Sequence, residues 1–303
     1  MTKISVIGAT SPLGVSLIPA LVSAGYDVNA SFRERSRIPD DWNAEPAISY
    51  HEIDLTSDFE VTEFATETVV WLAHIDAGRY NERETEVNVN AFDRFLSLID
   101  TDITKQVIFV SSGGSVYGEA ESLSIREDQE RRPLSTYGKT KRELEDRLME
   151  FRRASGIRTA ILRPGNIYGF ERPDRKTKGV TAGFLRTIIN GSPFTIIHGG
   201  KTVRDFVYVD DVCRAIILAV KNDSTNIVWN VGTGRGTSTL EVLNLILQQT
   251  GAKMPELIER ENFSSDVLTN ILDVERIRRE ANWSAEISLD EGMRRTLRYW
   301  NVG

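Results

Sequence analysis

A tyrosine and a lysine stand four residues apart at the start of a strongly helical stretch, so Tyr137 and Lys141 are expected on one helix face. A tyrosine hydroxyl, with a pKa of about 10, is a poor acid or base at neutral pH unless a nearby cation favours its phenolate. Lys141 provides such a cation, so the spacing is typical of a proton-transfer pair. The same spacing also occurs by chance on ordinary helices.

A second group of hydroxyls follows the apolar run at 107–110. The stretch SSGGSVYG at 111–118 carries Ser111, Ser112 and Ser115. A buried strand that ends in this way either closes in a plain turn or presents a hydroxyl to a ligand, because ligands bind at the carboxyl ends of parallel strands. The residue types alone leave both interpretations open.

The turn between the first predicted strand and the first predicted helix is rich in glycine. Glycines allow a tight turn and a close approach to a pyrophosphate, whose charge then meets the helix N-terminus. Any strand-to-helix turn favours glycine, so this turn is weak evidence by itself. The residues predicted to contact a dinucleotide here are Gly8, Thr10, Ser11, Pro12, Leu13 and Gly14.

The end of the second predicted strand indicates which dinucleotide is preferred. An NAD-binding unit places an acid here to bind the ribose 2′-hydroxyl, and Phe32 cannot accept that hydrogen bond. Arg33, helped by Arg35, can instead hold a 2′-phosphate. We therefore expect NADP(H) in preference to NAD(H), with NADPH bound more tightly than NADH by about 1–2 kcal/mol. The alternative is a solvated loop of mixed charge.

Short apolar runs alternate with amphipathic stretches over the first 165 residues, a pattern typical of a doubly wound α/β fold with a parallel sheet. The pattern predicts such a unit over residues 1–165, and the family resemblance described below adds about 203–232 to this expected dinucleotide-binding Rossmann domain. A smaller lobe is expected from about 166–202 and 233–303, because the rhythm breaks after Pro164. The predicted strands are 4–7, 27–32, 48–53, 69–73, 107–110 and 159–162, and the predicted helices are 13–24, 61–66, 84–98 and 137–155.

Composition limits the possible partners and sites. A formal net charge of −7 makes nucleic acid and anionic membranes unlikely partners, while a small anionic ligand needs only a local basic site. Cys213 is the single cysteine, so no disulfide forms within the chain. The spacing of His51, His74 and His198 does not indicate a metal site, and these histidines are interpreted as ordinary packing or surface residues. The N-terminus runs directly into a strand pattern without an apolar leader, and we expect a cytoplasmic protein.

These motifs, in this order, resemble the extended short-chain dehydrogenase/reductase family of nucleotide-sugar epimerases, dehydratases and 4-keto-reductases. The resemblance spans essentially the whole chain. It is carried by Gly8 to Gly14, DL at 54–55, NVN at 88–90, SS at 111–112 with VYG at 116–118, Tyr137 with Lys141, LRPGNIYG at 162–169, RDFVYVDDV at 204–212, NVGTG at 230–234, and NW at 282–283 with SLDEG at 288–292.

The resemblance implies roles for particular residues. Tyr137 is the expected acid/base for a sugar hydroxyl or ketone, and Lys141 is expected to lower the pKa of Tyr137 and to bind the nicotinamide ribose. Asn88 is expected behind the lysine or its water. Arg204 resembles the arginine that binds the nucleotide diphosphate, and Arg260 is a stand-in for a second arginine. Asn166 is expected at both cofactor and substrate, and the further cofactor contacts are Asp54, Leu55, Leu72, Ala73, Ser111, Pro164 and Ile167.

Two departures from the family pattern stand out. Ser11 and Pro12 replace the middle of the phosphate turn, which we expect still to bind. The catalytic Ser or Thr of the family falls on Gly113. In an extended backbone Ser115 projects to the same side as position 113, so Ser115 is the predicted substitute and Ser112 points away. On this argument Gly113→Ser restores the family arrangement. No carboxylate occupies 113–115, which disfavours a dehydratase.

Three functions are therefore compatible with the sequence. The main hypothesis is an NADPH-dependent reductase of a nucleotide-diphosphate 4-keto-6-deoxy sugar. The second is a nucleotide-sugar 4-epimerase resembling UDP-glucose 4-epimerase. The third is a nucleotide-sensing protein without catalysis. A homodimer is expected from the resemblance, with Phe92, Phe95, Leu144 and Leu148 spaced as apolar faces of the two helices that would meet a second copy.

Overall fold

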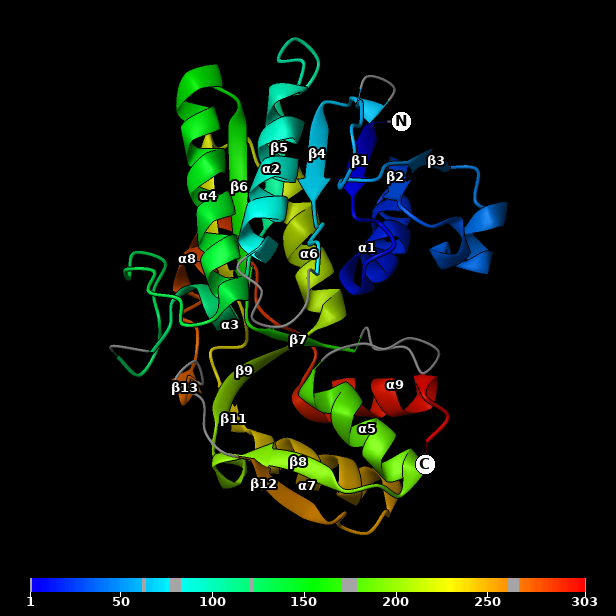
Figure 1. Cartoon of the computed structure of the whole chain (residues 1–303), viewed down its shortest axis with the longest axis vertical. Helices are drawn as coiled ribbons and strands as arrows, with labels where there is room; N and C mark the ends of the chain where they lie inside the picture. The colour runs from blue at the N-terminus through cyan, green and yellow to red at the C-terminus, as the bar shows by residue number, and fades with distance from the viewer. Residues whose placement is uncertain are drawn as a thin grey trace.

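A computed structural model describes residues 2–61, 64–76, 83–119, 122–169, 179–260 and 267–302. Figure 1 shows a larger part built on a parallel sheet, with a smaller lobe at the carboxyl ends of its strands. The large sheet has seven strands in the order β10-β6-β5-β4-β1-β2-β3, and every neighbouring pair is parallel. Its strands are β1 (Lys3–Ile7), β2 (Asp27–Phe32), β3 (Ile48–Glu52), β4 (Thr68–Trp71), β5 (Gln106–Val110), β6 (Arg158–Pro164) and β10 (Asn226–Val231).

Helices cover both faces of this sheet. The pair α1 (Pro12–Ser23) and α6 (Val209–Val220) packs on one face, and the pair α2 (Arg83–Ser97) and α4 (Thr136–Ser155) packs on the other (Figure 1). The predicted doubly wound fold is confirmed. The strand order reverses between β1 and β4, which is where folds of this kind bind their ligands.

The apolar residues expected on a dimer face belong to the core. Phe92, Phe95, Leu144 and Leu148 are all fully buried and pack with Trp71 and its neighbours on the sheet. The prediction that they line a surface between two copies is wrong, because the 3.6-residue period of a helix marks a buried face without showing what covers it. The homodimer itself stays a prediction, which light scattering tests.

Local sequence determines where the two helices of the expected site begin. Ser11 caps α1 by accepting a hydrogen bond from the Gly14 N–H at 3.2 Å, and Pro12 starts the helix. Ser135 caps α4 in the same way through the Gly138 N–H at 3.1 Å. Tyr137 therefore lies in the first turn of α4, at the ligand-binding edge of the sheet.

The lobe contains two small sheets. The first joins β9 (Val203–Tyr208) to β7 (Asn166–Tyr168), β11 (Gly236–Ser238) and β13 (Thr269–Asn270), and the second pairs β8 (Phe194–Ile197) with β12 (Leu257–Arg260). The remaining helices are α3 (Gly113–Val116), α5 (Val180–Asn190), α7 (Thr239–Thr250), α8 (Glu275–Ala281) and α9 (Leu289–Tyr299), and 3₁₀ turns cover Arg35–Arg37, Asp40–Ala44 and His198–Gly200.

The division into two domains stays a proposal, with one boundary moved. Strand β9 pairs with strands of the lobe, so we place the return of the chain to the larger part at the start of α6 and not at residue 203. The predicted helix over 61–66 is absent from the described helices, and its residues 62 and 63 lie outside the described part. A search of the described helices finds no candidate for a membrane span.

Candidate active site

The ends of β1 and β4 form a tight backbone cradle. Gly8 has a φ of +86°, and a Cβ added there would lie 2.8 Å from the Ala73 nitrogen. A Cβ on Gly14 would lie 2.3 Å from the Ala9 carbonyl oxygen. Both positions therefore require glycine, and the turn after β1 is tight and lies close to Ala73, which leaves the backbone accessible to a pyrophosphate at the N-terminus of α1.

A buried hydroxyl lies at the same edge. Ser111, directly after β5, is 3% exposed, and its Oγ has no hydrogen-bond partner among the described residues. An unpaired buried hydroxyl costs free energy unless a ligand or water satisfies it. Together with the glycine cradle, it fits a dinucleotide at this edge. Leu72 follows β4, Pro164 ends β6, and Ile167 is the middle residue of β7.

The residues after β2 are arranged differently from the prediction. Arg33 Nη2 lies 3.0 Å from Glu34 Oε1, and Arg37 Nε lies 3.1 Å from the other oxygen of Glu34. Glu34 thus partly neutralises Arg33, and a 2′-phosphate would have to compete with this carboxylate. Arg35 begins the 3₁₀ turn that follows. An acid is therefore present after β2, two residues beyond the strand end.

Asp54 and Leu55 follow β3, next to these arginines in the sheet order. The carboxylate of Asp54 accepts hydrogen bonds from the backbone N–H of Thr56 at 2.9 Å and from its hydroxyl at 2.7 Å. These bonds, with a smaller contribution from the charge of Arg33, lower the pKa of Asp54. These hydrogen bonds fix the start of the loop after β3.

Lys141 lies deep beside the end of β5. It is 3% exposed, and its Nζ donates a hydrogen bond to the Val110 carbonyl at 3.0 Å. The ammonium lies 4.9 Å from the Phe109 ring centroid and 5.6 Å from that of Tyr137. Burial lowers the pKa of Lys141 to about 8, against the opposing effect of the Glu145 carboxylate one helical turn further on.

Tyr137 keeps its proton more firmly than expected. One part of its ring is open, since the residue is 37% exposed, but burial of the hydroxyl raises its pKa to about 12. The negative charge of Glu84 contributes to this raised pKa, and a hydrogen bond with Ser112 opposes it. Burial dominates the pKa of Tyr137 in the protein alone, and the lowering effect expected of Lys141 stays a prediction.

The hydroxyl beside Tyr137 comes from Ser112 and not from Ser115. Residues Gly113–Val116 form a helical turn, α3, in which the N–H groups of Ser115 and Val116 donate to the Ser112 carbonyl at 3.2 and 2.9 Å. The extended backbone assumed for Ser115 is wrong, and two residues apart in a helix do not face the same way. Within the described part of the chain, the Ser115 hydroxyl makes no hydrogen bond.

The lack of a side chain at Gly113 has a steric reason. A Cβ there would lie 2.7 Å from the Arg163 carbonyl oxygen and 2.8 Å from Leu272 Cδ1. The Gly113 carbonyl also accepts a hydrogen bond from Asn270 at 3.1 Å. A serine at 113 would therefore enter this packing and would not point at Tyr137.

We accordingly expect Gly113→Ser to destabilise the protein by about 1–3 kcal/mol, the usual cost of overpacking, and not to restore activity. Urea unfolding of the purified variant measures this change. Gly191→Asn is a suitable control, because Gly191 has a left-handed φ of +61° that asparagine tolerates and has open space around it. A Gly113→Ser variant as stable as the unmodified protein would contradict the assignment.

The other predicted residues divide into two groups. Asn166 reaches the site: a Cβ on Gly114 would lie 2.9 Å from its Oδ1. Asn88 instead donates to the carbonyls of Ile75 and Glu84, both at 2.8 Å. Arg204 donates to the carbonyls of Val203, Val267 and Leu268 in the lobe, and Arg260 ends β12, just before residues outside the described part.

One residue that sequence reasoning dismissed lies at the site. The edge of the His74 ring meets the Tyr137 ring with centroids 4.8 Å apart, and His74 Nε2 lies 3.1 Å from Glu84 Oε1. The available signal was its place just after a predicted strand, at the edge where ligands bind. Among the described residues, no group of three or more His, Cys, Asp or Glu side chains is placed to hold a metal ion.

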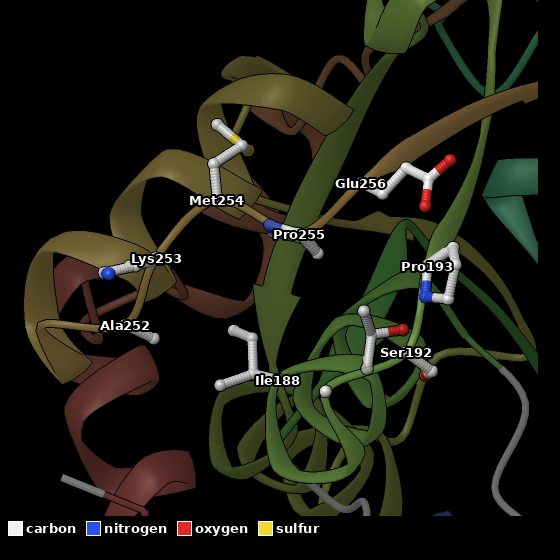
Figure 2. Close-up of a pocket in the computed structure, with 10 residues that line it drawn as sticks. Ile188, Ser192, Pro193, Ala252, Lys253, Met254, Pro255 and Glu256 are labelled. Carbon is white, nitrogen blue, oxygen red and sulfur yellow. The ribbon is translucent and has the colours of Figure 1, made fainter.

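A cavity of about 360 Å³ lies elsewhere, in the lobe. Figure 2 shows it between the end of α5, with Ile188 and Ser192, and the segment after α7, with Met254 and Pro255. None of the residues predicted from the sequence lines it. The strand ends around Tyr137 therefore remain the candidate active site.

The chain is similar to known proteins over most of its length. A putative UDP-glucose 4-epimerase of Methanocaldococcus jannaschii is 27% identical over 98% of this chain and 97% of its own length. The dTDP-4-dehydro-6-deoxyglucose reductase of Escherichia coli is 28% identical over 64% of this chain and 61% of its own length.

Two solved structures share the fold over 99% of both chains. One is UDP-glucose 4-epimerase of Thermotoga maritima with UDP-glucose, at 28% identity and a TM-score of 0.86. The other is MoeE5 in complex with UDP-glucuronic acid and NAD, at 27% identity and a TM-score of 0.87. The sequence also matches the NAD dependent epimerase/dehydratase family over residues 4–232. Because this match covers well over half of the 303 residues, the chain belongs to the NAD dependent epimerase/dehydratase family, as its motifs led us to expect.

Proposed function

We propose that the protein is a nucleotide-sugar 4-epimerase that acts on a UDP-hexose with bound NAD. The observation that carries this proposal is the extent of the match. The epimerase relative aligns over 97% of its length, including the part that corresponds to the lobe, whereas the reductase relative aligns over 61%. The proposal reverses the order of the two hypotheses drawn from the sequence.

The contacts around Tyr137 suit proton removal and return. Tyr137 takes the proton of the sugar 4-hydroxyl and later returns it, as a general base and then a general acid. Ser112 stabilises the phenolate through its hydrogen bond, and Lys141 supplies a buried positive charge behind the ring. NAD, when bound, supplies the hydride acceptor and donor at C4. We assign its binding to the turn at 8–14 and to Ala73, Ser111 and Lys141.

The dehydratase and the non-catalytic nucleotide-sensing protein are less well supported. Neither of the two glycines nor the serine in the first three positions of α3 offers the carboxylate that water elimination requires. A nucleotide-sensing protein would not need the contact between Ser112 and Tyr137. The 4-keto-sugar reductase remains the second candidate because the Escherichia coli reductase is 28% identical where it aligns.

We also propose NAD(H) as the cofactor. No finding supports the expected preference for NADP(H): the structural relative MoeE5 was solved with NAD, and Arg33 is paired with Glu34. We expect NADH to bind at least as tightly as NADPH, and Arg33→Ala to leave NADH affinity within about threefold, since exposed ion pairs contribute little. Fluorescence titration of both cofactors tests this, and tighter NADPH binding that Arg33→Ala abolishes would return the assignment to NADP(H).

Incubation of the purified protein with UDP-glucose decides the reaction. We expect UDP-galactose to appear without added cofactor and without net change in NADH absorbance. Oxidation of NADPH by a nucleotide-linked 4-keto-6-deoxy sugar, with no interconversion of UDP-hexoses, would select the reductase. UDP-glucuronic acid belongs in the same panel because MoeE5 was solved with that sugar nucleotide.

A further inference from the structure

We propose that His74 and Glu84 form a positioning pair that holds Tyr137 in place and restrains the loss of its proton. This inference rests on Tyr137 as the acid/base of the proposed reaction, and it adds two residues to which the sequence assigned no role. The pair comes from two elements far from α4 in sequence: His74 follows β4, and Glu84 lies in the first turn of α2.

The pair is built into the protein and is not a contact between mobile surface groups. Glu84 is 6% exposed, and its carboxylate lies 3.1 Å from the imidazole of His74. The first turn of α2 also favours a negative charge at Glu84, because backbone N–H groups point outwards there. Glu84 is therefore expected to stay ionised although it is buried.

Hydrogen bonds join the elements that carry the pair to α4, which carries Tyr137. Asn88 exchanges two hydrogen bonds of 2.8 Å with the backbone of Ile75, next to His74, and donates a third to the Glu84 carbonyl. The hydroxyls of Thr85 on α2 and Thr140 on α4 lie 2.8 Å apart. These hydrogen bonds join the segment after β4 to the starts of α2 and α4. The described hydrogen bonds of the Asn88 side chain belong to this network and do not involve Lys141.

The negative charge of Glu84 raises the pKa of Tyr137. Four described side chains surround the tyrosine: Lys141 on α4, Glu84 on α2, His74 after β4 and Ser112 after β5. A nearby negative charge disfavours a phenolate, and Glu84 raises the pKa of Tyr137 accordingly. His74 opposes this effect because its Nε2 hydrogen-bonds the carboxylate and draws part of the negative charge away from the phenol.

Such restraint suits a reaction that must both take and return a proton. A tyrosine that ionised too readily would be a weak acid catalyst for the return step, because general acid catalysis requires the protonated form. His74 and Glu84 act on this balance from outside α4, because His74 follows β4 and Glu84 lies in α2. Their contribution is electrostatic and positional, and neither residue needs to touch the substrate.

The test measures the ionisation of Tyr137 directly in the protein with its dinucleotide bound. Ultraviolet difference titration against Tyr137→Phe follows the tyrosinate of this residue alone. We expect Glu84→Gln to lower the midpoint by on the order of one pH unit, since it removes a like charge while keeping a hydrogen bond to His74. We expect His74→Ala to raise the midpoint, and the double variant to resemble Glu84→Gln.

Opposite shifts from the two partners are an outcome that general structural damage does not produce. Glu86→Gln is the matched control, because it makes the same charge change in the same helical turn and is expected to leave the midpoint unchanged. An unchanged or raised midpoint in Glu84→Gln overturns the proposal. If that variant does not fold, His74→Ala carries the test, and an unchanged or lowered midpoint overturns it.

The outcome is separable from the proposed function. Should the protein interconvert no UDP-hexose while Glu84→Gln still lowers the midpoint, the 4-epimerase assignment fails and the role of the pair stands. Should interconversion occur with no shift of the midpoint, the 4-epimerase stands and the pair has no role in ionisation.

Discussion

Tyr137→Phe is expected to lower turnover by about 10²- to 10⁴-fold while the dinucleotide still binds. Phenylalanine keeps the ring that meets His74 and lies beside the Lys141 ammonium, but it removes the hydroxyl that forms a hydrogen bond with Ser112. The loss should therefore appear in kcat, with little change in the affinity for NAD. Steady-state kinetics and a cofactor titration measure the two effects separately.

Tyr299→Phe is a matched control for this change. Tyr299 is about half exposed at the end of α9 in the lobe, and the loss of its hydroxyl should leave turnover within about twofold because surface substitutions rarely matter. A Tyr137→Phe variant that retained a tenth or more of the activity would show that another group transfers the proton. His74 would then be the first residue to examine.

Ser112→Ala is expected to lower turnover by about 10²-fold, the usual effect of removing one hydrogen-bond donor to a developing oxyanion. The Ser112 hydroxyl lowers the pKa of Tyr137, so its removal raises that pKa. The fraction of phenolate at a given pH then falls, and the rising limb of the pH–rate profile should move to higher pH. Kinetics between neutral and alkaline pH record both changes.

Ser115→Ala serves as the matched control and is expected to change turnover by less than about threefold. Ser115 makes its described hydrogen bond through the backbone, and its carbonyl lies against Gly138, where a Cβ would be 2.4 Å away. A large effect of Ser115→Ala with a small effect of Ser112→Ala would show that α3 unwinds when substrate binds. The original assignment of Ser115 would then be correct.

Much of the fold could be predicted because it depends on local pattern. The alternation of apolar runs and amphipathic stretches places β1, β2, β3 and β5 within one or two residues of their observed bounds. Ser11 and Ser135 cap their helices through N–H groups three residues away, so the starts of α1 and α4 can be read from the chain. Tyr137 and Lys141 share a helix face because they are four residues apart in α4.

The errors arose where distant contacts override local preference. Two glycines after β5 permit an extended chain or a turn equally, and α3 is selected by Arg163, Asn270 and Leu272, which pack on Gly113 from 50 to 159 residues away in sequence. Likewise, apolar periodicity identified Phe92 and Leu144 as buried, but it could not distinguish the sheet of the same chain from a second copy.

The sequence by itself determined the doubly wound sheet, the glycine-rich turn at its edge and the pairing of Tyr137 with Lys141, because each can be read from local pattern and spacing along the chain. Only the tertiary structure decided which serine meets Tyr137, that Glu34 engages Arg33, and that His74 and Glu84 flank the tyrosine. The contacts of Tyr137 join residues from β4, β5, α2 and α4. The contact between Arg33 and Glu34 depends on how the two side chains point after β2. Their strength depends on distance and burial, which residue types and spacing along the chain do not encode.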